Sequence, residues 1–374
     1  MIDDWGAPVS AVLPRAHRLL SDDRAAAIAT LVDVDGSAYR RPGAKLLVSG
    51  DGDGTGAVAP GCLEREVTRL IESVIEGGRP RLESFDLRMD DDSIGLGVGC
   101  DGRVELLIEP LDETYSRALS AYASRDRGAL LSVIEGASDV SVGDRGWYQE
   151  ERGFEDIRGP WPDWVRHRVT DTARRLARNG GGETIRIERP EGAVRVFIDG
   201  IVPPPRLLVI GTGNDVSPVV TIGSLAGFDV DVVGYRSEFA DEDTFPTAAT
   251  IHSTSPSTLR NAIDVGEDTY CVVMTHNFVD DRLTVEELLE TPSPYIGVVS
   301  SRDRSENLIE AIEGGSALRT TDRRRVYAPV GLDLGGGSPG QIALSTVSEV
   351  VAVHNEREPG HLRDRTEPIH HRND

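Results

Sequence analysis

The feature that most constrains the fold of this chain is the regular alternation of apolar and amphipathic segments after residue 205. Short apolar runs lie at 206–210, 230–234, 249–252, 270–275 and 295–299, and helical patterns lie at 283–290, 305–312 and 341–354. Apolar runs of this length are typical of strands buried on both faces, and intervening helices make such strands parallel. We therefore predict an α/β fold with a doubly wound parallel sheet at residues 203–357, followed by a polar tail at 358–374.

A glycine-containing turn, Gly211-Thr212-Gly213-Asn214, directly follows the first of these strands and opens a helix. Glycines let the backbone approach a phosphate, and the free N–H groups of a helix N-terminus favour an anion. The arrangement is Rossmann-like, but the third glycine and the acidic residue expected after the second strand are both missing. Gly211, Gly213 and Asn214 are therefore candidate phosphate-binding residues. A tight strand–helix turn without a ligand is the alternative.

The run Pro203-Pro204-Pro205 is a stiff spacer and the best domain boundary in the chain. Residues 1–202 are predicted to form a separate N-terminal α/β domain, with strands near 25–34, 44–48, 82–87 and 104–109. The stretch at about 114–199 is less regular and includes a polar, glycine-rich part at 142–159, so it is interpreted as a variable insert. No internal repeat is apparent in the sequence.

Two cysteines lie in glycine-rich turns. Cys62 stands just before a helical pattern, and Cys100 follows a glycine-rich segment. A helix N-terminus lowers the pKa of a thiol, which suits sulfur transfer or binding of a soft metal. Small buried side chains are the alternative for both, and Glu64 is either a surface acid or a site carboxylate. Cys271 lies mid-strand and reads as core, and no zinc-type spacing is present.

Two further candidates follow strands of the C-terminal domain. His276 ends the strand at 270–275, and Arg302 follows the strand at 295–299. The carboxyl edge of a parallel sheet is where such folds bind ligands. His276 is therefore a candidate ligand contact or a capping residue, and Arg302 is a candidate phosphate contact or a surface charge.

The composition excludes several classes of partner. The chain has 63 acidic and 40 basic residues, a formal net charge of -23, and Lys45 as its only lysine. An acidic surface repels nucleic acid and anionic lipid, and scattered acid fits a salt-rich cytosol. No apolar segment of about 18 residues and no signal-peptide pattern is present. Three cysteines in so long a chain are too few for a disulfide framework, so a cytoplasmic protein is expected. The acidic charge leads us to expect a halophilic protein.

A set of short segments, taken together, resembles one protein family. In the N-terminal part they are Gly36-Ser37, Arg40-Arg41-Pro42-Gly43-Ala44-Lys45, Gly61-Cys62-Leu63-Glu64, Gly95-Leu96-Gly97 with Cys100, and Ile108-Glu109-Pro110-Leu111. In the C-terminal part they are Gly211-Thr212-Gly213, Met274-Thr275-His276, Ser301-Arg302 and Ala328-Pro329-Val330-Gly331-Leu332-Asp333. Their order and spacing are similar to those of the XdhC/CoxI family, accessory proteins of molybdenum hydroxylases.

The resemblance implies a factor that binds molybdenum cofactor, supports its sulfuration and delivers it to a xanthine- or carbon-monoxide-dehydrogenase-like client. It also implies Cys62, Cys100 and Glu64 as the reactive residues, a cysteine desulfurase as a second partner, and a homodimer. Such a factor is a cofactor-insertion chaperone rather than a catalyst. An NAD(P)-dependent oxidoreductase and a non-catalytic partner-binding scaffold are the alternatives, since a fold does not determine a function. The family's pattern is altered at Ala59-Pro60, Asp101, Asn214 and Gly234, which bears on the ligand more than on the fold.

Overall fold

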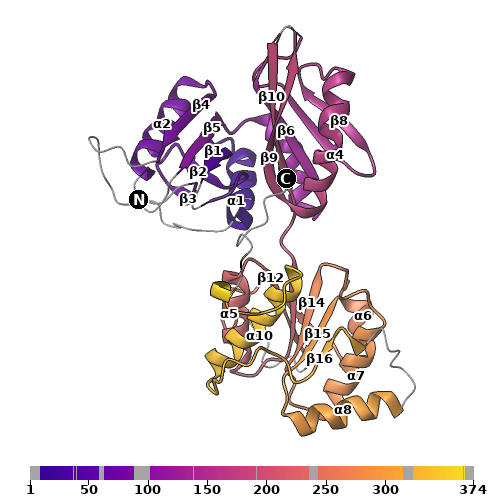
Figure 1. Ribbon diagram of the computed structural model, residues 1–374. Helices are drawn as coiled ribbons and strands as arrows, with labels where there is room; N and C mark the ends of the chain where they lie inside the picture. Colours follow the sequence, from indigo (N-terminus) through magenta and orange to yellow (C-terminus); the bar gives the residue numbers. More distant parts are fainter. Residues whose placement is uncertain are drawn as a thin grey trace. The chain divides into compact units, whose positions relative to one another are not determined.

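The computed structural model of the chain describes residues 9–36, 38, 40–58, 63–87, 102–137, 139–190, 192–235, 243–314, 323–364 and 366 (Figure 1). The chain divides into two compact units, Met1–Pro203 and Pro204–Asp374, within the proline run. Proline fixes φ and cannot extend a helix, and residues 202–205 accordingly have no regular secondary structure.

The first half of the N-terminal unit is an antiparallel sheet with the strand order β3-β2-β1-β5-β4. Alternate residues of β1 face opposite sides: Ala27, Ala29 and Leu31 pack on α2, whereas Ala26 and Ile28 face a second core that includes α1. Its elements are α1 (Val9–Ser21), β1 (Ala26–Gly36), β2 (Lys45–Ser49), β3 (Gly54–Gly56), α2 (Glu64–Gly77), β4 (Arg81–Asp86) and β5 (Gly102–Pro110).

The second half repeats this topology. Its sheet has the order β8-β7-β6-β10-β9. Strands β6 to β10 therefore occupy the same places in this sheet as β1 to β5 occupy in the first. The elements are η1 (Glu113–Tyr115), α3 (Ser116–Ala123), β6 (Gly128–Glu135), β7 (Arg145–Gln149), β8 (Gly153–Arg158), α4 (Asp163–Asn179), β9 (Gly181–Arg189) and β10 (Gly192–Ile201). The stretch predicted to be a variable insert at 114–199 thus forms a regular half of the unit, and the polar stretch at 142–159 includes β7 and β8.

The two halves share one apolar core, and two buried ion pairs each join a residue of one half to a residue of the other. Helices α1 and α3 contribute to a single apolar cluster, together with Ile28 of β1 and Leu130 of β6. Lys45 Nζ at the start of β2 donates to Asp199 Oδ1 of β10 at 2.8 Å. In the reciprocal place, Arg145 Nη2 at the start of β7 donates to Glu109 Oε1 of β5 at 2.5 Å. The two pairs thus join equivalent strands of the two halves in reciprocal fashion.

The C-terminal unit is a six-stranded parallel sheet of order β13-β12-β11-β14-β15-β16. The predicted doubly wound fold is thereby confirmed. Its elements are β11 (Arg206–Ile210), α5 (Val216–Leu225), β12 (Asp229–Gly234), β13 (Thr250–Ser253), η3 (Pro256–Thr258), α6 (Leu259–Ala262), β14 (Thr269–Val273), α7 (Phe278–Leu289), β15 (Tyr295–Val298), α8 (Arg302–Gly314), β16 (Val326–Tyr327), α10 (Pro339–His354) and η4 (Leu362–Asp364).

Helices cover both faces of this sheet. One apolar cluster packs α5 and α10 on one face, and another packs α6, α7 and α8 on the other (Figure 1). The strand order reverses direction between β11 and β14, the central pair. In open parallel sheets this switch point leaves a crevice at the carboxyl ends of the strands, where ligands bind. A ligand site is therefore expected at the carboxyl ends of β11 and β14.

Candidate functional site at the carboxyl edge of the parallel sheet

The turn after β11 requires its first glycine. Gly211 has φ +151°, and a Cβ atom at this position would lie 2.5 Å from the carbonyl oxygen of Met274. A side chain there would push β11 and β14 apart, so the glycine brings the turn against the neighbouring strand. Helix α5 begins at Val216, after Asp215 at the N-cap position. The predicted residues Gly211, Gly213 and Asn214 thus lie together in the turn before α5, and a helix N-terminus is a place where free N–H groups favour an anion.

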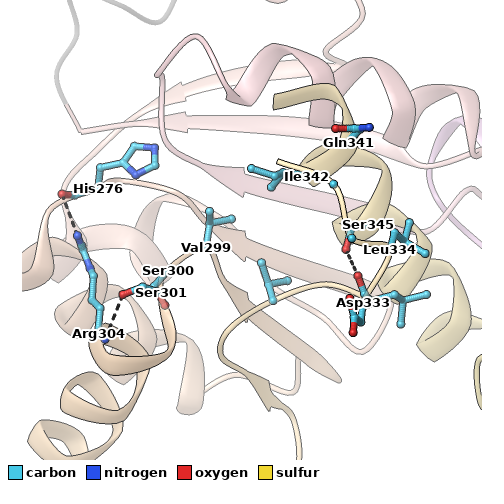
Figure 2. Close-up of a pocket in the computed structure, with 14 residues that line it drawn as sticks. His276, Val299, Ser300, Ser301, Arg304, Asp333, Leu334, Gln341, Ile342 and Ser345 are labelled. Atoms are coloured by element: carbon cyan, nitrogen blue, oxygen red, sulfur yellow. Dashed lines mark hydrogen bonds between the residues drawn. The ribbon is translucent and has the colours of Figure 1, made fainter. Parts of the chain in front are cut away.

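Two cavities adjoin this edge, and His276 lines both. The smaller, about 350 Å³, is bounded by the Gly211–Asn214 turn, Tyr235 and Asp280. The larger, about 600 Å³, lies on the β15–β16 side, between the segment at 299–304, the loop at 330–336 and the first turns of α10 (Figure 2). His276 therefore lies between the Gly211–Asn214 turn and the larger cavity.

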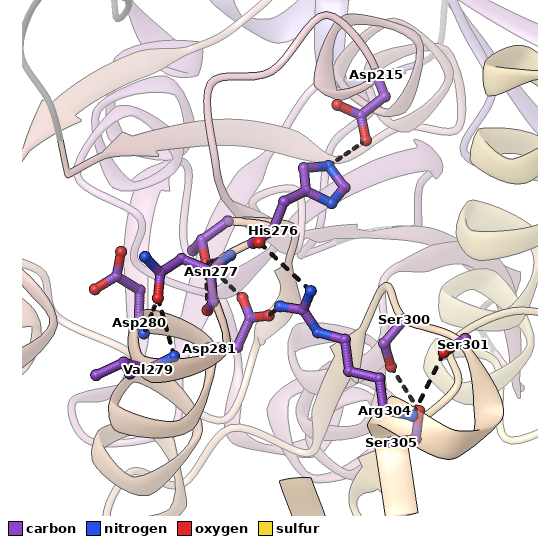
Figure 3. Close-up of polar contacts among 11 residues, drawn as sticks. Asp215, His276, Asn277, Val279, Asp280, Asp281, Ser300, Ser301, Arg304 and Ser305 are labelled. Atoms are coloured by element: carbon purple, nitrogen blue, oxygen red, sulfur yellow. Dashed lines mark hydrogen bonds and ion pairs between the residues drawn. The ribbon is translucent and has the colours of Figure 1, made fainter. Parts of the chain in front are cut away.

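His276 has an unusual backbone conformation and two polar contacts. Its φ of +57° places it in the left-handed region, which is uncommon for a side-chain-bearing residue. Its ring Nε2 lies 2.8 Å from Asp215 Oδ2, at the start of α5 (Figure 3). Its carbonyl oxygen accepts a hydrogen bond from Arg304 Nη1 at 3.4 Å. The imidazole is thereby fixed beside the turn while its side chain stays about half exposed, at 52%.

The buried carboxylate of Asp281 contacts both Thr275, next to His276, and Arg304. Asp281 in the first turn of α7 accepts from Thr275 Oγ1 at 2.5 Å and pairs with the Arg304 guanidinium. Its side chain is only 2% exposed, so the pair satisfies a charge that would be costly to bury alone. Asn277 caps α7 by accepting from two backbone N–H groups. The capping role considered for His276 therefore belongs to its neighbour.

Arg304, and not the predicted Arg302, lines the larger cavity. Arg302 is the first residue of α8 and is exposed. Sequence reasoning missed Asp215 and Arg304 as partners of His276. The available signals were an acidic residue directly before a helix and a basic residue one turn from a strand end, and both are common on surfaces.

The thiol candidates differ in what the structure says of them. Cys62 and Cys100 lie outside the described residues, and Glu64 begins α2, with its side chain not described. Cys271 is fully buried in β14, and burial raises the pKa of its thiol to about 12. Such a thiol stays protonated and inert at neutral pH, which confirms its assignment to the core.

In the described ranges, no three His, Cys, Asp or Glu side chains gather as a metal site. Nor does any helix of those ranges have the length and apolar character needed to cross a membrane.

Comparison with known proteins places the chain in a family. The profile of the XdhC Rossmann domain matches residues 207–350, and that of the XdhC and CoxI family matches residues 19–86. The chain is 27% identical over 338 residues to a Bacillus subtilis protein named as a probable subunit of xanthine dehydrogenase, covering 89% of this chain and 94% of that one. It is 22% identical over 368 residues to the molybdenum cofactor insertion chaperone PaoD of Escherichia coli, covering 95% and 94%.

A solved structure extends the likeness to three dimensions. The crystal structure of a protein from Bacillus halodurans, described as a xanthine dehydrogenase, superposes with a TM-score of 0.72 and 27% identity. The match covers 93% of this chain and 96% of the other, so it includes both units. With both profiles matched in order along the chain, the protein belongs to the XdhC and CoxI family.

Proposed function

We propose that this protein is a maturation factor for a xanthine-dehydrogenase-type molybdenum hydroxylase. In this role it binds molybdenum cofactor as cargo, supports its sulfuration and delivers it to the client. The observation that carries the proposal is the glycine turn at the switch point of the sheet, in a chain that spans 94% of a relative named as a molybdenum cofactor insertion chaperone. A labile, phosphate-bearing cargo needs an anion site and shelter from water until it is transferred.

The described residues suit the phosphate end of such a cargo. In the proposal, the phosphate accepts hydrogen bonds from the backbone N–H groups of Gly213 and Asn214, at the positive end of the α5 dipole. The imidazole of His276 lies beside the turn, and Arg302 or Arg304 at the start of α8 adds positive charge. Because Asp281 already pairs with Arg304, we assign Arg304 mainly to positioning His276.

The thiol half of the proposal rests on the N-terminal unit. In the sequence, Cys62 comes two residues before the first residue of α2, and a helix N-terminus in general stabilises a thiolate. A thiolate is a soft ligand and a sulfur acceptor, so we propose that Cys62, with Cys100 and Glu64, serves the sulfuration step. A cysteine desulfurase is the proposed source of sulfur, and the proposed assembly is a homodimer.

The test compares cysteine variants in cells that make the client hydroxylase. We expect Cys62→Ala to leave the client folded but inactive, without cofactor or without its terminal sulfur. Cys271→Ala is the matched control, because it removes a thiol that is buried in β14 and shielded from reaction. Full client activity in both Cys62→Ala and a complete deletion of the protein would refute the maturation role.

One observation favours a second candidate. The strand order of the C-terminal sheet is that of dinucleotide-binding folds, so an NAD(P)-dependent oxidoreductase remains a competing proposal. Against it, β12 ends at Gly234 and is followed by Tyr235, where a ribose-binding acid would stand, and Tyr235 Oη bonds to Thr284 Oγ1 at 2.6 Å. Titration with NADH and NADPH discriminates: saturable binding at micromolar concentration supports the oxidoreductase.

A further inference from the structure

The larger cavity has the features of a ring-binding subsite. The apolar side chains that line it include Val299, Val330, Ile342 and Leu334, and Leu334 is 53% exposed (Figure 2). Val299 and Val330 are partly buried, whereas Ile342 and Leu334 are exposed, and covering such apolar side chains with a flat ring in a cavity of about 600 Å³ is favourable. The cavity adjoins the phosphate turn through His276.

The loop that closes this cavity is fixed by its own hydrogen bonds. Gly331 N donates to Glu349 Oε2 at 2.9 Å, and Tyr295 Oη donates to the same atom at 2.7 Å. Ser345 Oγ of α10 donates to the carbonyl oxygen of Leu332 at 2.5 Å. Gly331 has φ +105°, which only glycine adopts without strain. The backbone on the N-terminal side of Asp333 is thereby held against α10.

Asp333 is an exposed carboxylate at the lining of the larger cavity. Among the described residues its carboxylate has no hydrogen-bond or ion-pair partner, and the same holds for the carboxylate of Asp280 at the smaller cavity, whereas Asp215 lies against His276 and Asp281 pairs with Arg304. A carboxylate is an acceptor only, so it prefers a ligand edge that offers two adjacent N–H donors. Cytosine and adenine each present one donor beside an acceptor, which a carboxylate repels. The 2-amino-4-oxopyrimidine edge of guanine and of pterins presents two donors.

We propose that this cavity binds the ring end of the ligand, and that Asp333 reads its 2-amino-4-oxopyrimidine edge with two hydrogen bonds. This rests on the proposed function for the phosphate end, which lies on the Gly213–Asn214 turn. The ligand then crosses His276 from one cavity to the other. Asp333 sets specificity, and the turn supplies affinity common to all phosphate ligands.

Calorimetric titration of the full chain with pyrophosphate, guanosine diphosphate and adenosine diphosphate tests the two ends separately. We expect guanosine diphosphate to bind about tenfold more tightly than adenosine diphosphate, since a bidentate pair discriminates between bases by about 1–3 kcal/mol. Asp333→Asn should lower the affinity for guanosine diphosphate by about tenfold and raise that for adenosine diphosphate, because an amide matches a donor–acceptor edge. Pyrophosphate should bind the variant and the wild type equally.

Asp303→Asn is the matched control, because Asp303 is an exposed acid on α8 outside the cavity lining. Equal affinity for the two nucleotides, or an unchanged preference in Asp333→Asn, overturns the inference and leaves the phosphate site standing. If neither pyrophosphate nor guanosine diphosphate binds, the inference and the phosphate site of the proposed function fail together.

Discussion

Lys45, the only lysine of the chain, is a structural residue in the core of the N-terminal unit. It is 3% exposed and bonds to Asp199 and to the carbonyl oxygen of Gly43. Burial raises the pKa of Asp199, and the Lys45 ammonium opposes that rise. Because the pair joins β2 of one half to β10 of the other, its loss affects the contact between the two sheets.

Lys45→Met should therefore destabilise the protein by about 3–5 kcal/mol, because it leaves a buried carboxylate without its partner. The native pKa of Asp199 rises further in the variant, so the native state binds a proton that the unfolded state releases. The loss of stability is then largest at neutral pH and shrinks as the pH falls through the raised pKa. Urea unfolding at pH 7 and pH 5 measures it.

Two controls separate this effect from the loss of packing. Lys45→Met combined with Asp199→Leu should recover most of the stability, since no charge is left buried. Arg24→Met removes an exposed pair with Asp51 and should cost less than 1 kcal/mol. Equal losses in Lys45→Met and Arg24→Met would contradict the assignment.

At the scale of elements, the loop between β16 and α10 depends on one carboxylate of the helix. Glu349 accepts from Gly331 N and Tyr295 Oη. Burial, with Glu349 close by, raises the pKa of Tyr295 well above its usual value, so the phenol stays a donor at every working pH. The loop position is therefore decided by α10 and β15 together.

Glu349→Leu should leave both donors without an acceptor and cost about 1–3 kcal/mol for each buried group. We also expect a several-fold loss of guanosine diphosphate affinity with no change for pyrophosphate, because the turn after β11 is untouched. Glu349→Gln keeps an acceptor oxygen and is the control. Thermal unfolding measures the loss of stability in the two variants, and the same titrations measure their nucleotide affinities. Wild-type affinity for guanosine diphosphate in Glu349→Leu would show that Glu349 does not position the loop.

At the scale of the whole molecule, charge is the dominant feature. A formal net charge of -23 spread over 374 residues produces self-repulsion that opposes compaction. Salt screens this repulsion, with a Debye length of about 10 Å at 0.1 M and about 3 Å at 1 M. Exposed ion pairs such as Arg178–Glu150 lose strength under the same screening, but each contributes little.

Thermal unfolding should therefore shift to higher temperature as KCl rises from 0.1 M to molar concentrations. The net repulsion that is screened outweighs the weakened surface pairs. Sodium sulfate at low concentration is a poor substitute for this test, because it also strengthens apolar burial. A midpoint independent of KCl would contradict the halophilic prediction.

The family resemblance and the C-terminal fold were accessible from the sequence because their signals are local. Apolar runs, helical periodicity and the Gly211–Asn214 turn each lie within a few residues, and burial on both faces forces the parallel arrangement. The predicted start of α7 at 283 was late, since the helix begins at Phe278 after the Asn277 cap. Cap geometry decides such boundaries, and apolar periodicity does not report it.

Only the tertiary structure showed the duplication and the partners of the site. The pairs Lys45–Asp199 and Arg145–Glu109 join residues 154 and 36 positions apart, and each reads in sequence as a surface charge. The His276–Asp215 contact spans 61 positions. Periodicity reports which face of an element is buried, whereas the match between two charges depends on the register of strands that meet only after folding. The sequence therefore determined the elements of the C-terminal unit, and the packing of the sheets decided which side chains act together.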